Sequence, residues 1–362
     1  MTRCDVAVIG GGPAGAAAAI LAARRGLSVA LFERGTPGRD KVCGEYVSAE
    51  ALPLLEQLIP GVVAAAPVLM AAAWISRRGR RVEFALPRPA RGISRLQLDG
   101  ALWGAAGAAG AVLHPRIAVT AYRATAPGAE LDTDAGTYQA RYVLVAAGRW
   151  WRLAGLAAGA IAAPSPAEGW VGVKARLTGV AGSSMVEMFV FRGGYCGLAP
   201  VENGWTNACC LIHRESAAGL ANCHDFPAWI TAAAAHPALA ERLRPGRQAT
   251  PTVVTAPVMM GARTAVCAGA LLTGDAAGFV DPFTGDGLAR ALLSAQLAVE
   301  HLDRPEDYAR ALQRAGGQSF RVGAALRWLT QAPPWLQEGV LRALARPRWA
   351  ASLVAATRWR TL

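Results

Sequence analysis

The sequence predicts an α/β fold with a parallel sheet flanked by helices, an inserted antiparallel sheet and a helical C-terminal segment. Three features of the chain support this expectation. Residues 5–33 pass through a strand, a glycine-rich turn, a helix and a second strand, residues 165–260 contain strand patterns broken by glycine-rich turns, and residues 303–362 are helical apart from prolines. At 362 residues, of which 53% are hydrophobic and 17% charged, the chain can bury a large core in one or two domains.

The N-terminal stretch DVAVIGGGPAGAAAAILAARRGLSVALFE has a turn with three glycines at G-x-G-x-x-G spacing, which are Gly10, Gly12 and Gly15. This spacing allows a tight turn, a close approach of a phosphate to the backbone, and close packing of helix on strand. The helix expected from Ala14 to Arg25 presents free N–H groups at its start that favour an anion. Glu33, at the end of the second strand, is placed to accept hydrogen bonds from a ribose. The stretch therefore predicts a dinucleotide site rather than a glycine-rich turn alone.

Apolar runs and turn residues set the elements expected in the rest of the chain. In order, these are a helix over 49–58 with Ser48 as its N-cap, a hairpin with strands at 73–76 and 82–84, a helix that is entered at 93–99 and runs to 109, strands at 117–122 and 142–146 with a hairpin around Gly136, strands at 170–177, 185–191 and 206–212, a helix over 227–243, a strand at 265–273 and a helix over 287–302. The expected domain segments are 1–72, 95–160 and 263–302 for the first domain, 73–94 as a hairpin joining the inserted sheet, 161–262 for the inserted domain, and 303–362 for the helical C-terminus.

The net charge of +12 at pH 7 comes almost wholly from arginine, since Lys41 and Lys174 are the only lysines. No recognition motif accompanies this charge, so nucleic acid is not an expected partner. Seven scattered cysteines, without a C-x-x-C pair or a Cys/His cluster, predict free thiols in a reducing compartment and no metal site. The first strand begins within a few residues of Met1, which leaves no room for a signal peptide, and we expect a cytoplasmic protein.

Three further motifs join the N-terminal one. They are Lys41-Val-Cys43-Gly44, Arg95-x-x-Leu98-Asp99, and Gly274-Asp275-Ala-Ala-Gly278-x-x-x-Pro282-x-x-Gly285-x-Gly287. As a set they resemble the FAD-dependent oxidoreductases with the p-hydroxybenzoate hydroxylase fold, and among these most of all the geranylgeranyl-reductase-like branch. The resemblance covers residues 3 to about 300. It implies a Rossmann-type FAD-binding domain with an inserted antiparallel β-sheet substrate domain and a helical C-terminus.

The resemblance implies FAD as the cofactor. Asp275 then corresponds to the aspartate that hydrogen-bonds the ribityl chain, and the helix beginning near Gly287 points its positive end at the flavin edge that becomes negative on reduction. Arg95 would reach a phosphate or ribityl oxygen, and Lys41 would face phosphate. The competing interpretations are an exposed arginine for Arg95 and a helix cap for Asp275. The residues expected at the cofactor are Gly10, Gly12, Pro13, Ala14, Gly15, Glu33, Arg34, Lys41, Cys43, Gly44, Arg95, Val119, Gly274, Asp275, Pro282, Gly285 and Gly287.

Departures from the resembled proteins concern the electron donor and the substrate. Residues 146–149, AAGR, have alanine where hydroxylases of this fold often carry an aspartate before glycine, and there is no second G-x-G-x-x-G. NAD(P)H is therefore expected only as a transient electron donor, with an electron-donor protein as the alternative. The stretch YCGLAP from Tyr195 to Pro200 keeps only the tyrosine and proline of the Tyr-x-Trp-x-Phe-Pro motif of geranylgeranyl reductases. The Trp-x-Trp-x-Ile-Pro motif of flavin halogenases is absent.

Three functions stay open at this point. The first expectation is a monooxygenase that hydroxylates a hydrophobic aromatic or polyketide-derived small molecule, for which the protein must position the ring and exclude water. The alternative is reduction of a C=C bond, as in isoprenoid substrates, with a hydride from the flavin and a proton from a nearby acid. Cys43 and Tyr195 are the candidate catalytic residues. The alternative interpretations are that Cys43 is a small buried hydrophobic residue and that Tyr195 is a tyrosine packed in the core. The third is a flavin-binding protein without its own substrate.

The C-terminal segment combines tryptophan with arginine. Its tryptophans are Trp328, Trp335, Trp349 and Trp359, and from residue 310 onward Glu338 is the only acid against nine arginines. Trp349, Leu353 and Val354 share one helical face in the expected helix. Such a helix can lie in a membrane interface, so we expect possible contact with a membrane surface. The alternative is that the helices close over the substrate sheet with the tryptophans buried.

Overall fold

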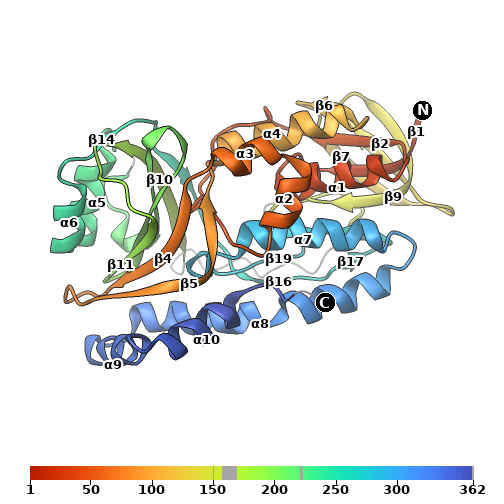
Figure 1. The fold of residues 1–362 in the computed structure, drawn as a ribbon. Helices are drawn as coiled ribbons and strands as arrows, with labels where there is room; N and C mark the ends of the chain where they lie inside the picture. Colours follow the sequence, from red (N-terminus) through yellow and green to blue (C-terminus); the bar gives the residue numbers. More distant parts are fainter. Residues whose placement is uncertain (150, 157–168, 221–222, 361–362) are drawn as a thin grey trace.

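The computed structural model describes residues 1–149, 151–156, 169–220 and 223–360, and it contains two large sheets and a layer of helices (Figure 1). The α/β class, the antiparallel second sheet and the helical C-terminus expected from the sequence are confirmed. The boundary expected between residues 160 and 161 lies outside the described residues.

The first sheet is built around β1 (Thr2–Ile9), which pairs in parallel with β2 (Val29–Glu33) and β9 (Gly136–Val145). β18 (Ala270–Leu272) adds a parallel strand beside β9, so three distant segments of the chain meet in this sheet. The other strands are β6 (Val112–Pro115), β7 (Val119–Ala124), β8 (Ala129–Thr133) and β17 (Val266–Cys267). The sequence does not predict β6, because its four residues VLHP are short and show no apolar alternation.

The helices of the first domain pack closely because they are rich in alanine. α1 (Pro13–Arg24) contacts α4 (Arg95–Ala108) and α7 (Gly287–Glu300), and almost all of its first ten residues are buried. At Gly15 a Cβ atom would lie 1.8 Å from the carbonyl oxygen of Gly10, so the helix can sit this close to the turn only without a side chain. The packing role expected for Gly15 is therefore confirmed.

The second sheet has the strand order β14-β10-β13-β12-β11-β4-β5-β3. All neighbouring strands are antiparallel except β4 and β11, which run parallel. α5 (Phe226–Ala234) and α6 (Pro237–Leu243) pack on one face of this sheet, and the other face looks toward the first domain (Figure 1). The strands are β3 (Tyr46–Val47), β4 (Val68–Ile75), β5 (Arg81–Gly92), β10 (Trp170–Thr178), β11 (Met185–Phe191), β12 (Gly194–Pro200), β13 (Thr206–His213) and β14 (Arg247–Gln248), with β15 (Val253–Thr255) beside β10.

The C-terminal helices form a layer along the lower edge of the molecule in Figure 1. They are α8 (Pro305–Gln331), α9 (Pro334–Leu344) and α10 (Pro347–Thr357), and each begins with proline, which is well tolerated in the first turn. Leu326 and Leu329 of α8 pack into one apolar cluster with Trp74 and Val190 of the second sheet. The smaller elements are α3 (Pro60–Ala65) and the pair β16 (Gly261–Ala262) and β19 (Gly278–Phe279).

The expected helix over 49–58 begins later than predicted. α2 spans Leu52–Leu58, its N-cap is Ala51, and the Ser48 hydroxyl has no hydrogen-bond partner among the described residues. Pro53 explains the shift, because it lacks an N–H group and would clash with the carbonyl of residue 49 in a helix that began there. Ser48 as an N-cap is therefore wrong.

The helix expected over 227–243 is two helices, α5 (Phe226–Ala234) and α6 (Pro237–Leu243). The break occurs at Ala235, whose φ of +46° lies in the left-handed region, and the His236 ring caps α6 by accepting a hydrogen bond from the Leu239 N–H. Pro237 then starts the second helix.

The strand expected over 265–273 is a short hairpin. β17 and β18 are joined by a turn in which Ala268 and Gly269 have φ values of +46° and +83°. A glycine preceded by alanine at these two positions marks a tight turn inside what otherwise reads as one apolar run.

Replacing Gly15 by alanine is expected to lower the free energy of unfolding by about 3 kcal/mol, because the added Cβ would overlap the Gly10 carbonyl oxygen. Gly12→Ala is the matched control, since a Cβ there meets no atom closer than 3.9 Å. Urea denaturation of the two variants measures the difference, and equal losses in both would contradict this account of the turn.

Candidate cofactor and substrate site

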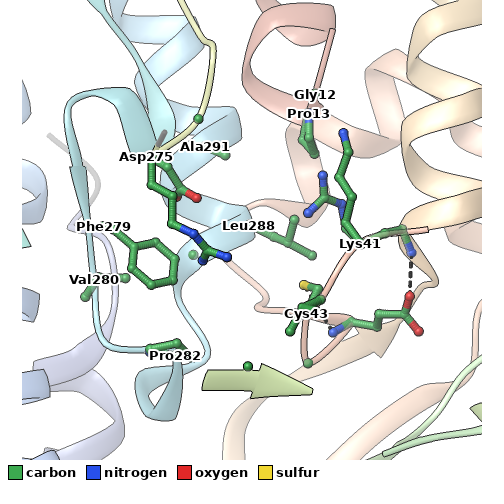
Figure 2. A pocket seen from close by; sticks show the side chains of 18 of the residues that line it. Gly12, Pro13, Lys41, Cys43, Asp275, Phe279, Val280, Pro282, Leu288 and Ala291 are labelled. Atoms are coloured by element: carbon green, nitrogen blue, oxygen red, sulfur yellow. Dashed lines mark hydrogen bonds between the residues drawn. The ribbon is translucent and has the colours of Figure 1, made fainter. Parts of the chain in front are cut away.

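One cavity of about 620 Å³ lies between the two sheets and is closed by the C-terminal helices. Its first half is formed by the carboxyl ends of β1, β2 and β9, which is where open parallel sheets bind ligands. Its second half is formed by the face of the second sheet that looks toward the first domain. Figure 2 shows the region where the two halves meet, between Lys41 and Cys43 on one side and Asp275 and Phe279 on the other.

The structure brings most of the predicted site residues to this cavity. Among the described lining residues are Gly10, Gly12, Pro13, Ala14, Glu33, Arg34, Lys41, Cys43, Gly44, Arg95, Val119, Tyr195, Asp275, Pro282, Gly285 and Gly287. Gly15 and Gly274 lie behind the lining and allow close packing, since a Cβ on Gly274 would lie 3.0 Å from the Ala14 methyl group. Pro200 does not line the cavity, although its neighbour Ala199 does.

The N-terminus of α1 has two cations beside it. Gly12 caps the helix without a side-chain hydrogen bond, and a Cβ on Gly12 would stand 3.9 Å from Lys41 Nζ and 4.0 Å from Arg95 Nη2. Free helix N–H groups and two positive side chains therefore converge on the space above Gly12. A pyrophosphate is the cofactor group that this charge arrangement fits.

Asp99 holds both cations in place. Its carboxylate accepts from Arg95 at 2.7 Å through each oxygen and from Lys41 Nζ at 2.9 Å, and the residue is 1% exposed. Burial opposes ionisation of Asp99, but the two cations outweigh it and lower its pKa below the ordinary value. One net positive charge remains for the ligand. The sequence names Asp99 only as part of a motif, because its partner Lys41 lies 58 residues away.

Glu33 is held by the backbone of two turns. Its Oε2 accepts from the Gly11 N–H and its Oε1 from the Gly35 N–H, both at 2.8 Å. The carboxylate still lines the cavity, and each oxygen has a second lone pair for a ribose hydroxyl. This geometry fits the role expected for Glu33.

The flavin end of the expected site lies at the start of α7. Asp275 lies inside the short 3-10 turn Gly274–Ala276 rather than at its N-cap position, which is Thr273, and it lines the cavity (Figure 2). Burial raises the pKa of Asp275, although nearby arginines oppose this. Gly285, with φ of +68°, and Gly287 leave the first turn of α7 open, and no side chain caps it. An acceptor for ribityl hydroxyls and a free helix N-terminus fit the flavin half of FAD.

A buried ion cluster ties the loop between β2 and β3 to the second sheet. Lys174 Nζ lies 2.5 Å from Asp40 Oδ1 and Glu45 Oε1, and Arg176 Nη2 lies 2.8 Å from the same two atoms. Glu45 also accepts from the backbone N–H of Arg95 at 2.8 Å. The two cations and two carboxylates balance, so the cluster anchors the loop without adding net charge to the cavity.

Cys43 and Tyr195, the candidate catalytic residues, both line the cavity. The Cys43 sulfur accepts a hydrogen bond from the Glu45 N–H at 3.3 Å, and burial raises the pKa of its thiol, which therefore stays protonated near neutral pH. The Tyr195 ring packs edge-on against Phe283, with centroids 4.9 Å apart. Its buried hydroxyl has no hydrogen-bond partner among the described residues, and burial raises its pKa well above 10. Each can donate a proton or a hydrogen bond to a ligand.

Asp286 is a buried acid that the sequence analysis does not single out. Both carboxylate oxygens are buried without a close hydrogen-bond partner among the described residues, and the Trp359 backbone N–H is the backbone donor that lies nearby. Burial raises its pKa to about 7, although Arg358 and Arg290 act in the opposite direction. Only a three-dimensional view could find it, because Arg358 comes from the far end of the chain.

Proteins similar to this chain are flavoenzymes and reductases. The family model described as FAD dependent oxidoreductase matches residues 5–53. The menaquinone reductase of Mycolicibacterium smegmatis is 28% identical, over 93% of this chain and 87% of that protein. The digeranylgeranylglycerophospholipid reductase 2 of Methanopyrus kandleri is 29% identical, over 86% of this chain and 80% of that protein.

Solved structures share the fold at lower sequence identity. A geranylgeranyl bacteriochlorophyll reductase-like protein of Thermoplasma acidophilum has a TM-score of 0.77 at 17% identity, covering 99% of this chain and 96% of that chain. A flavin-dependent brominase has a TM-score of 0.79 at 18% identity, covering 98% of this chain and 93% of that chain.

A dinucleotide cradle on a parallel sheet, closed by a second sheet over one cavity, fits an FAD-dependent oxidoreductase, the family whose model matches residues 5–53. In fold the chain is similar to a geranylgeranyl reductase-like protein, and in sequence to a digeranylgeranylglycerophospholipid reductase.

Gly12→Val is expected to give folded protein without FAD, because the larger side chain fills the space that Lys41 and Arg95 face. Heat-released cofactor and the visible absorption spectrum measure occupancy. The control is Gly104→Val, at an α4 glycine where a Cβ meets nothing within 4 Å. Full FAD occupancy in folded Gly12→Val protein would disprove the anion site at α1.

Asp286→Asn is expected to stabilise the protein at pH 8 but not at pH 4. The folded-state pKa of Asp286 is about 7 against an ordinary 3.8, so the unfolded chain loses this proton first and stability falls as pH rises between these values. The neutral amide removes that loss, which is at most about 4 kcal/mol. Urea denaturation at both pH values tests the sign, and a variant equally stabilised at pH 4 would refute the buried-acid explanation.

Proposed function

We propose that the protein reduces a C=C bond in an isoprenoid chain of a lipid. The observation that carries this proposal is the composition of the cavity wall formed by the second sheet. The residues that β4, β5 and β10–β13 contribute to it are Ala72, Ala73, Trp74, Phe84, Leu86, Gly172, Val186, Met188, Tyr195, Gly197, Ala199, Cys209, Cys210 and Leu211. This wall has no charged group and suits a hydrocarbon chain better than a polar molecule.

Two relatives favour reduction of a C=C bond over hydroxylation and over flavin binding without a substrate. The proteins that match over most of the chain are named menaquinone reductase and digeranylgeranylglycerophospholipid reductase, and both names denote reduction of lipids. The small residues Gly197 and Ala199 stand where geranylgeranyl reductases have aromatic side chains, so the cavity here is wider on that side and favours a different isoprenoid lipid.

Reduction of a C=C bond needs a hydride, a proton and a dry, apolar site. Bound FAD in its reduced form supplies the hydride. Cys43 lies where the cofactor half of the cavity meets the sheet half, and its neutral thiol gives the proton to the second carbon of the double bond. The free hydroxyl of Tyr195 orients a polar end or head of the substrate on the sheet side.

The electrons for the next turnover come from NAD(P)H as a transient donor or from an electron-donor protein. Hydroxylation of a hydrophobic aromatic or polyketide-derived molecule, the first expectation from the sequence, stays a prediction and is the other outcome of the experiment below.

Dithionite-reduced holoenzyme is mixed, without O2, with a prenylated quinone and separately with a geranylgeranyl lipid. Reoxidation of the flavin and a product whose isoprenoid chain has gained two hydrogen atoms at one C=C bond, measured after any quinol has been reoxidised to the quinone, are expected for at least one substrate. If the flavin is reoxidised only when O2 is admitted, and the product has gained an oxygen atom, the protein is a hydroxylase and the proposal is wrong.

Cys43→Ala is expected to lower this anaerobic turnover by about 100-fold while FAD stays bound, because it removes the proton donor. Tyr195→Phe should lower it by about tenfold, since one hydrogen bond to the substrate is lost. Cys4→Ala is the control, because Cys4 is a free cysteine on β1 outside the cavity. Unchanged turnover in Cys43→Ala would remove this thiol from the mechanism.

A further inference from the structure

Three exposed tryptophans project from the C-terminal helices. Trp328 on α8 is 62% exposed, Trp335 on α9 is 70% exposed and Trp349 on α10 is 59% exposed. Trp359, by contrast, is buried, so only part of the expected tryptophan set packs inside. A large exposed indole costs free energy in water, and three on one structural unit indicate a surface that meets something apolar.

The three helices form a single layer. α8, α9 and α10 contact one another, and Figure 1 shows them side by side beneath the second sheet. Each helix buries other positions against the molecule, such as Leu326 on α8 and Leu341 on α9. The three exposed tryptophans therefore lie on the part of this helical layer that faces solvent.

The charge of this layer is positive beyond the first turn of α8, where Glu306 and Asp307 lie beside Arg304 and Arg310. From residue 310 to residue 360 the only acid is Glu338, and its carboxylate is buried and bound by Ser76 and Arg80. Arg321, Arg342, Arg346 and Arg348 are exposed. Tryptophan and arginine are side chains that hold a helix at the surface of an anionic bilayer.

The same layer borders the apolar cavity. Leu353 and Val354 of α10 line the cavity wall, which agrees with the alternative that these helices close over the sheet. Trp349 lies one helical turn before Leu353 and is exposed.

We propose that the helical layer of Trp328, Trp335, Trp349 and the exposed arginines docks on a lipid bilayer with anionic headgroups. Among the described residues no helix is long and apolar enough to cross a membrane, so the contact is at the interface. Because α10 both belongs to this layer and lines the cavity through Leu353 and Val354, the docked layer gives a hydrocarbon chain a route from the bilayer along α10. This route rests on the proposed function, whereas the docking itself does not.

FAD-loaded full-length protein is centrifuged with vesicles of phosphatidylglycerol and phosphatidylcholine, with vesicles of phosphatidylcholine alone, and without vesicles. We expect pelleting with the anionic vesicles at low salt and release at high salt, because screening weakens the arginine contribution. Protein that stays in the supernatant with anionic vesicles, or pellets without any vesicle, would overturn the proposal, the second result showing self-association.

Variants separate docking from folding and from catalysis. The triple change Trp328→Ser, Trp335→Ser, Trp349→Ser should lower the bound fraction about tenfold or more with FAD retained. The control pair Leu96→Ser and Val112→Ser, exposed at 47% and 59% on the first domain, should bind as wild type. Equal binding by the tryptophan variant would refute the assigned surface. Because no substrate is present, these results do not depend on which reaction the enzyme performs.

Discussion

The ion cluster of Asp40, Glu45, Lys174 and Arg176 is the constraint on which the site depends. It joins a loop of the first domain to β10 of the second sheet, over more than a hundred residues of sequence. The same loop carries Lys41 toward the anion site and Cys43 toward the substrate half. Glu45 keeps a φ of +55°, a strained value for a residue with a side chain, and its many partners hold it there. Breaking one partner would leave a buried charge uncompensated, which typically costs about 3–5 kcal/mol.

The cavity is divided chemically at this loop. On the cofactor side, Asp99 organises two cations around a helix N-terminus, and Asp275 provides an acceptor near a second helix N-terminus. On the sheet side the wall is hydrocarbon, sulfur and one phenol. Neutral proton donors suit this boundary, because burial keeps the thiol of Cys43 and the hydroxyl of Tyr195 protonated. The fold thereby gives a charged cofactor and an apolar substrate adjacent halves of one cavity, one lined by charged groups and the other by apolar groups.

The sequence predicted what short-range rules control. The glycine spacing, the alanine-rich α1 and the prolines that start α8, α9 and α10 act within a few residues, and their elements appear as expected. What it could not predict depends on distant partners or on single backbone angles. Asp99 and Glu45 acquire their importance from residues far along the chain, β12 is hidden in a glycine-rich stretch, and the break at Ala235 needs a left-handed residue that is not glycine. Helical periodicity predicted that Trp349, Leu353 and Val354 share a face but not what covers it, and the structure places Leu353 and Val354 in the cavity wall.

The parallel pairing of β4 with β11 has a consequence for synthesis of the chain. The hairpin of β4 and β5 is complete by Gly92, but its neighbour in the sheet begins only at Met185. In the first sheet, β9 likewise lacks its neighbour β18 until the chain has been synthesised to about residue 270. A nascent chain therefore exposes unpaired strand edges while roughly half of the protein is still being translated, and both domains close late through contacts of high sequence separation. We therefore expect this interleaved topology to fold slowly, and the nascent chain to need protection from aggregation at its unpaired strand edges.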